Sequence, residues 1–234
     1  MAAMKRRAWI LSASLLTLAA LSAGVFWYRN AGVESALLAQ PAFPALKEHS
    51  RAEYLRVLDA YERFRAGEGT ELEFLNVASA QYTLASTRRL AHASQESVLA
   101  LMRDTLVTVK KLQAKSPETC FKYWFPEVAG PAEVAQVLSA EDLRHTMELQ
   151  STVVRTAAEN PVAAPDPEEV KEPLGNIVNS MYEQYGSDAQ MVAHAEDARV
   201  DRAKVCTITT AVYERILALP PETSSKLIRV MAAG

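Results

Sequence analysis

Glycine is scarce in this chain, and the motifs that depend on glycine are missing. The 234 residues include only 8 glycines. We find neither the glycine-rich loop that cradles phosphate groups nor the Gly-x-Ser-x-Gly turn that presents a nucleophilic serine. The sequence therefore gives no support to a P-loop nucleotide-binding protein or to a serine hydrolase of that type, and no motif predicts a cofactor.

A strong excess of either charge is also lacking. The formal net charge is −3, and no run of like charge is longer than two or three residues. The residues after position 7 carry 22 basic and 28 acidic side chains, a net charge of −6. Because nucleic acids bind to basic surfaces, this composition argues against a nucleic acid as a partner.

One long apolar segment lies near the N-terminus. Residues 8–28 contain no charged side chain, and they follow the basic run Lys5-Arg6-Arg7. These 21 residues, as a helix, rise about 31 Å, which matches a hydrocarbon core of about 30 Å. We therefore predict a single transmembrane helix that contacts the lipid bilayer through residues 8–28. A cleaved signal peptide is the alternative, although the apolar run continues past Ser22-Ala23-Gly24, where cleavage would fall.

The basic residues before this segment also predict its orientation. Positive charge collects on the cytoplasmic side of a membrane helix, so we expect residues 1–7 to form a cytoplasmic tail and the bulk of the chain to lie outside. In an alanine-rich chain this layout favours a bacterial inner-membrane protein that faces the periplasm. Small residues on one face of the helix could form the seam of a homodimer, and they are Ala13, Thr17, Ala20 and Gly24.

Cysteine is nearly absent, and the two present are Cys120 and Cys206. An oxidising compartment favours a disulfide between an even number of cysteines, whereas a reducing cytosol favours buried free thiols. Since both residues are predicted to lie outside the cytoplasm, we predict a disulfide between Cys120 and Cys206. A thiol enzyme that uses Cys120 with a distant histidine is a less economical explanation.

The fold class predicted from hydrophobic periodicity is all-α. Apolar residues recur at helical spacing through most of the chain, and no segment alternates convincingly as a strand. Thr70 and Ser139 have the pattern of N-cap residues, and Ser116-Pro117 marks another helix start. We expect an outer domain of about six or seven helices, including the Val-Thr run at 205–212. The main helical patterns cover about 51–65, 71–90, 94–114, 139–154, 174–185, 188–216 and 222–231.

Proline marks the expected boundaries of the outer domain. Residues 29–46 contain two prolines and are predicted to be a stalk. Residues 160–173 contain four prolines and four acidic residues, which is the composition of a linker. We therefore predict a first helical half at 47–159 and a second half at 174–234 that packs against it.

Aromatic residues are most dense, outside the predicted anchor, directly after Cys120. Aromatic side chains anchor many protein interfaces, so this cluster is a candidate interaction patch. The alternative is that the cluster fills the core beside the disulfide. The candidate residues are Phe121, Tyr123, Trp124 and Phe125.

Two sets of histidine and acidic residues have the spacing of a helix face. Metal ligands must converge on one point, and two such faces on neighbouring helices can meet this condition. A solvated charged surface explains the same pattern, so no metal is assigned. The weak candidates are Glu141, His145, Glu148, His194 and Asp197.

These features favour a membrane-anchored protein outside the cytoplasm that acts as a non-catalytic interaction or accessory module for an envelope protein. One alternative is a membrane-tethered hydrolase or metal-dependent enzyme. Another is a helical protein that binds an apolar ligand between its two halves. An exposed aromatic patch would favour the interaction module, and an apolar cavity would favour the ligand-binding protein.

Overall fold

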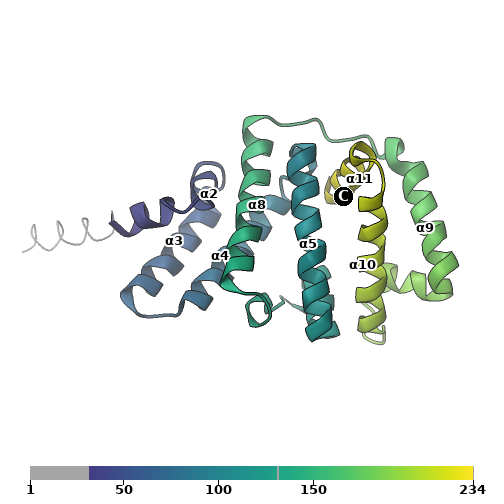
Figure 1. Cartoon of the computed structure of the whole chain (residues 1–234), viewed down its shortest axis with the longest axis horizontal. Helices are drawn as coiled ribbons and strands as arrows, with labels where there is room; N and C mark the ends of the chain where they lie inside the picture. Colours follow the sequence, from purple (N-terminus) through teal and green to yellow (C-terminus); the bar gives the residue numbers. More distant parts are fainter. Residues whose placement is uncertain (1–31, 131, 234) are drawn as a thin grey trace, which may run out of the picture.

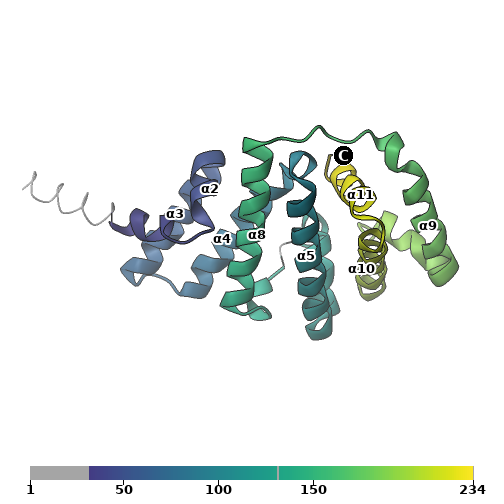
Figure 2. The same ribbon diagram turned by 45° about the horizontal axis from the view of Figure 1, so that its top comes forward.

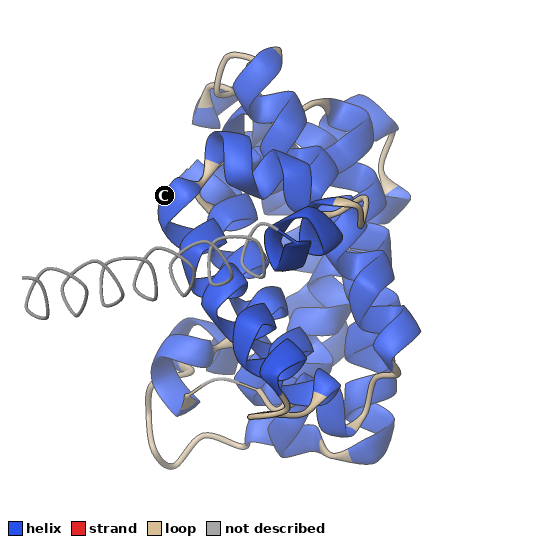
Figure 3. Ribbon diagram, turned by 90° about the vertical axis from the view of Figure 1, so that its left-hand side faces the viewer, coloured by secondary structure: helices blue, strands red, loops and turns tan. Residues whose placement is uncertain are grey.

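The computed structural model describes residues 32–130 and 132–233. Within these residues all regular structure is helical, and no strand is present (Figure 3). The predicted all-α class is therefore confirmed for this part of the chain. Among the same residues, no helix combines the length and the apolar character needed to span a bilayer. The predicted tail at 1–7, the anchor at 8–28 and the dimer seam lie outside the described residues.

The described ranges contain more helices than the six or seven predicted from the sequence. A helical segment at 32–38 comes first, and ten α-helices follow it, joined in places by 3-10 helices. The α-helices are α2 (Phe43–His49), α3 (Arg51–Ala66), α4 (Glu71–Thr87), α5 (Gln95–Lys115), α6 (Pro117–Trp124), α7 (Pro126–Ala129), α8 (Ala140–Glu159), α9 (Lys171–Tyr185), α10 (Arg202–Ala218) and α11 (Pro221–Ala233). The 3-10 helices are η1 (Leu90–His92), η2 (Val134–Gln136), η3 (Pro167–Val170) and η4 (Gly186–His194).

The longer helices lie side by side in a row (Figures 1 and 2). The order along the row is α3, α4, α8, α5, α10 and α9, and each helix packs against the next. Spatial order therefore differs from chain order, because α8 lies between α4 and α5. The segment at 32–38 lies at the α3 end of the row, and α9 forms the opposite end.

Shorter helices cover the row. Helix α2 packs against α3 and α8, α6 packs against α5 and α10, and α11 packs against α5 and η1. Helix α6 thus bridges two helices that come from opposite sides of the predicted linker.

Helix α8 contributes to the hydrophobic core on both of its sides. Met147 and Val154 belong to a buried cluster shared with α2, α3 and α4. Val153 and Ala157 belong to another buried cluster, shared with α5, α9, α10 and α11. The second cluster joins helices from both predicted halves, so the division at 160–173 is not a division of the core.

Residues 32–46 pack into the domain, so the predicted stalk at 29–46 is wrong over its described part. Leu37, Phe43 and Leu46 are at most 1% exposed. Each of these side chains belongs to the same core cluster as α3 and α4. This segment is therefore a structural part of the domain.

Polar contacts fasten the same segment to α3. Tyr54 donates a hydrogen bond from its hydroxyl group to Glu34 Oε1 at 2.9 Å. Lys47 Nζ lies 3.0 Å from the same carboxylate oxygen. The Lys47 and Tyr54 hydrogen bonds lower the pKa of Glu34. The helical segment that follows residue 31 is thus held to the body of the domain by both apolar and polar contacts.

The predicted linker at 160–173 is extended only in its first part, because η3 begins at Pro167 and α9 begins at Lys171. This first part crosses from α8 to α9 over one end of the row (Figure 2). The Val162 N–H donates a hydrogen bond to the His92 carbonyl at 2.9 Å, and Arg229 donates one to the Ala163 carbonyl. The connection is therefore tied to η1 and α11 along its length.

The single long helix predicted at 188–216 is interrupted. Helix η4 ends at His194, and α10 begins only at Arg202. Asp201 caps α10 by accepting a hydrogen bond from the Lys204 N–H at 3.1 Å. The Val-Thr run at 205–212 lies within α10, which confirms that it is helical.

Candidate functional site

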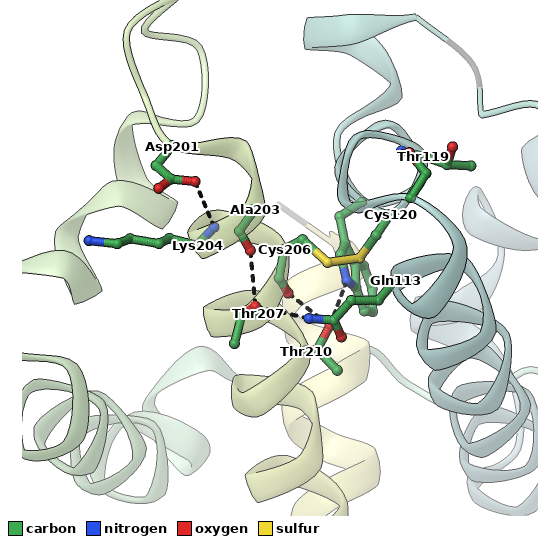
Figure 4. The surroundings of a disulfide bond; sticks show 11 residues. Gln113, Thr119, Cys120, Asp201, Ala203, Lys204, Cys206, Thr207 and Thr210 are labelled. Carbon is green, nitrogen blue, oxygen red and sulfur yellow. Dashed lines mark hydrogen bonds between the residues drawn. A yellow bond between two sulfur atoms is a disulfide. The ribbon is translucent and has the colours of Figure 1, made fainter.

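A disulfide joins α6 to α10 through Cys120 and Cys206, the pair predicted from the sequence (Figure 4). The two Cα atoms are 5.9 Å apart, and both cysteines are completely buried. Val109 and Leu112 on α5 belong to the same buried cluster. Since both cysteines and their neighbours on α5 are buried, the bond lies inside the core and is shielded from solvent.

Threonine hydroxyls organise the polar contacts around this bond (Figure 4). Thr210 donates a hydrogen bond to the Cys206 carbonyl at 2.8 Å, within α10. Gln113 on α5 donates one to the Thr207 hydroxyl at 2.9 Å. The second of these contacts holds α10 against α5, and the first lies within α10.

Of the four aromatic residues at 121–125, Phe121 packs into the core and the other three are half-buried. Phe121 is completely buried and stacks on Phe125 with ring centroids 5.1 Å apart. Trp124 is half-buried and stacks on Tyr213 of α10, with ring centroids 4.6 Å apart. Its indole N–H donates a hydrogen bond to the Thr210 hydroxyl at 3.3 Å. The prediction of an interaction patch is therefore corrected for Phe121, and the contacts favour the alternative that the cluster fills the core.

Tyr123 is half-buried and packs against the buried cluster that contains both cysteines. Desolvation raises the pKa of its hydroxyl group to about 12. A phenol with this pKa stays protonated at neutral pH, so it supplies a hydrogen-bond donor and no charge to its surroundings.

The weak metal candidates do not form a metal-binding group. No set of three or more His, Cys, Asp or Glu side chains suited to a metal ion is found among residues 32–130 and 132–233. The Nε2 atom of His145 on α8 lies 3.8 Å from Oδ1 of Asp104 on α5. Asp197 follows η4 and accepts hydrogen bonds from Arg199, which lower its pKa to about 2. The two predicted faces, with Glu141 and Glu148 on one and His194 on the other, thus have separate local contacts.

A groove of about 380 Å³ lies at the α3 end of the row, and the sequence does not predict it. It is lined by four segments: the turn before α2 with the start of that helix, and parts of α3, α4 and α8. The lining residues are Gln40, Pro41, Ala42, Phe43, Tyr61, Phe64, Glu71, Phe74, Arg144, Met147 and Glu148. It lies within the predicted first half, not between the two halves.

Aromatic side chains make up the apolar part of the groove lining. The ring of Phe74 is the centre of this group, with centroids 6.0 Å from Phe43, 5.0 Å from Tyr61 and 6.1 Å from Phe64. Phe64 is half-buried, whereas the other three rings are at most 5% exposed. The accessible aromatic surface of the groove therefore comes mainly from Phe64.

Charged side chains occupy the edge of the groove. Arg144 on α8 pairs with Glu71 at the start of α4. Glu148 lies four residues after Arg144, which places it one turn further along α8, and it is exposed. Among the described residues Glu148 makes no ion pair within 4.0 Å, so it is the one lining charge without a partner.

For two of the groove residues, the sequence predicts an apolar position on a helix. The helical spacing of Tyr61 and Phe64 marks them as apolar residues of one helix face. Phe43 and its neighbours give no such signal, because two prolines make their segment resemble a stalk. Comparisons of the chain with protein-family models, curated proteins and solved structures found no match.

Proposed function

We propose that this chain is a bacterial inner-membrane protein whose helical domain faces the periplasm and serves as a non-catalytic binding module for an envelope protein. The observation that supports this best is the buried disulfide between α6 and α10. Disulfides persist in oxidising compartments, and an anchor at 8–28 preceded by Lys5-Arg6-Arg7 would place the domain in one. Since the segment at 32–46 packs into the domain, the module would sit close to the bilayer.

A topology experiment tests the location. A reporter that is active only outside the cytoplasm, fused after Gly234, should be active on a full-length, membrane-bound product. A thiol reagent added to the denatured, non-reduced chain should label no cysteine, whereas Cys206→Ser should make Cys120 available for labelling. An inactive reporter, or labelling of both cysteines in the unchanged chain, would overturn the proposed location.

A crosslinking experiment tests the binding role. A photo-crosslinking amino acid at Gln40, at the groove, should give a discrete adduct with one envelope protein in intact cells. The same amino acid at Gln95, an exposed residue at the start of α5, is the matched control and should give none. Equal crosslinking from both positions, or no protein adduct from Gln40, would count against a specific module that binds through this end.

The groove supports a second candidate function, the binding of a small apolar ligand. Its volume of about 380 Å³ lies in the range of ligand-binding sites, and its lining is rich in aromatic side chains. The neutral fluorescent probe N-phenyl-1-naphthylamine should brighten on binding to the full-length protein in nanodiscs, relative to empty nanodiscs. Gln40→Trp, which narrows the groove, should weaken this signal, whereas Gln95→Trp should leave it unchanged. Equal signals from the two variants would exclude the groove as the binding site.

A further inference from the structure

The charges at the groove edge indicate what kind of ligand the groove can take, and this inference rests on the second function proposed above. Three charged residues line the groove, and two of them, Glu71 and Arg144, neutralise each other. Glu148 makes no ion pair with any residue of 32–130 or 132–233, so its negative charge is left uncompensated within this part of the chain. A ligand that brought a second negative charge here would be repelled, whereas a positive charge would find a partner.

The aromatic lining favours the same sign of charge. The face of an aromatic ring carries partial negative charge and attracts an ammonium group placed over it. Phe64 gives the groove accessible aromatic surface, and it lies parallel to Phe74 with an interplanar angle of 11°. An apolar body can cover Phe64 while its ammonium group reaches the Glu148 carboxylate, since both residues line the same groove and neither is buried.

We propose that the groove binds a small organic cation, an ammonium group attached to an aromatic or aliphatic body of about ten carbon and nitrogen atoms. The apolar body supplies most of the affinity by leaving water, and the ammonium group supplies selectivity through Glu148. The groove volume of about 380 Å³ accommodates a molecule of this size.

The test uses two probes that share an apolar body and differ in charge, 3-phenylpropylammonium and 3-phenylpropionate. Each is titrated into the full-length protein in nanodiscs, with empty nanodiscs subtracted, and binding is followed by calorimetry and by saturation-transfer NMR. The ammonium probe should bind several-fold more tightly than the carboxylate probe. Glu148→Gln should weaken binding of the ammonium probe about threefold, as expected for an exposed ion pair.

Two further variants complete the design. Glu141→Gln removes an exposed carboxylate from the first turn of the same helix, outside the groove, and should leave both affinities unchanged. Glu148→Lys should reverse the preference, so that the carboxylate probe binds more tightly. Circular dichroism of each variant shows whether the fold is kept, and because Glu148 and Glu141 are exposed we expect it to be.

The possible outcomes separate the ligand class from the function on which it rests. If the neutral probe binds in the groove but the two charged probes bind equally, or if Glu148→Gln has no effect, the groove binds ligands but is not selective for cations. If neither the neutral nor the charged probes bind, the ligand-binding function itself fails together with this inference. Tighter binding of the carboxylate probe to the unchanged chain would also overturn the proposed ligand class.

Discussion

At the scale of single residues, a buried arginine connects segments that are far apart in the chain. Arg229 on α11 is 6% exposed, and it donates hydrogen bonds to the carbonyl oxygens of Ala91, at 2.9 Å, and Ala163. Burial lowers the pKa of its guanidinium group, because the charged form loses hydration. Arg229 thereby links α11 to η1 and to the extended part of the connection between α8 and α9.

Replacing this arginine tests the importance of the link. Arg229→Met should lower the free energy of unfolding by about 2 kcal/mol, since two carbonyl groups lose a charged donor. Urea titration followed by circular dichroism measures the change. Arg155→Met is the control, because Arg155 is 50% exposed and pairs only loosely with Glu159 at 3.9 Å. A loss just as large in the control would show that the buried hydrogen bonds are not the cause.

Buried tyrosines predict how stability depends on alkaline pH. Burial raises the pKa of Tyr123 to about 12 and also raises the pKa of Tyr82. Tyrosines in the unfolded chain titrate near pH 10. Between about pH 10 and pH 12 the unfolded state therefore loses protons that the folded state keeps, so the free energy of unfolding should fall as the pH rises through this range.

Two phenylalanine variants distinguish this effect from general alkaline damage. Tyr82→Phe should flatten the fall in stability above pH 10, when urea titrations are compared at several pH values. Tyr182→Phe should not, because the Tyr182 side chain is 42% exposed and lies outside the core. A curve for Tyr82→Phe that matches the unchanged protein above pH 10 would contradict the prediction.

At the scale of the helix, the N-cap residues predicted from the sequence are confirmed at the starts of three helices. Thr70 and Glu73 form a reciprocal capping box at the start of α4, and Ser139 and Asp142 form one at the start of α8. Ser116 caps α6 as predicted. Such contacts satisfy backbone N–H groups that have no partner inside the helix, so they depend on a few adjacent residues and can be read directly from the sequence.

The capping residues can be tested one helix at a time. Thr70→Ala and Ser139→Ala should each lower the free energy of unfolding by about 1 kcal/mol, and Thr70→Gly by only a few tenths. Urea titration of the three variants gives the comparison. Ser187→Ala, at an exposed position in η4, is the control and should have little effect. A glycine variant at position 70 less stable than the alanine variant would contradict a capping role.

Other helix boundaries could not be predicted, because two residue types act differently according to context. Pro44 lies at the start of α2, where the missing N–H of proline costs nothing, yet in the sequence it resembles part of a stalk. Asp197 accepts a hydrogen bond at 2.9 Å from the Arg199 N–H two residues later, a local turn that competes with helix. The prediction of a single helix at 188–216 followed the spacing of the apolar residues and did not take this turn into account.

The groove was beyond sequence reasoning for a different reason. It forms only when α8 lies beside α4, although α5, α6 and α7 separate these helices in the chain. In the sequence Glu148 shares a helix face with Glu141 and His145, whereas in the structure it lines a groove together with Phe64 and Phe74. Which helix faces meet depends on packing across the whole domain, and no local pattern encodes that choice.

At the scale of the whole molecule, the shared core predicts that the two predicted halves stay together after the connection is cut. A specific protease site inserted between Ala164 and Pro165 lies in the exposed or half-exposed part of the connection. After cleavage, the fragments should elute as one species in gel filtration, even when the disulfide has been reduced. Separation of the fragments on reduction would mean that the bond, and not the core around α5, α8 and α10, holds them.

The disulfide also limits how far the molecule can be extended by force. The cysteines are 86 positions apart in sequence. In an optical-tweezers experiment that pulls on the two ends, this loop would not lengthen while the bond is intact. A reductant would release about 300 Å of additional contour length, taking about 3.5 Å for each of the 86 residues. The oxidised chain therefore has a shorter maximum extension than the reduced chain, because more than a third of its residues lie in the loop that the disulfide closes.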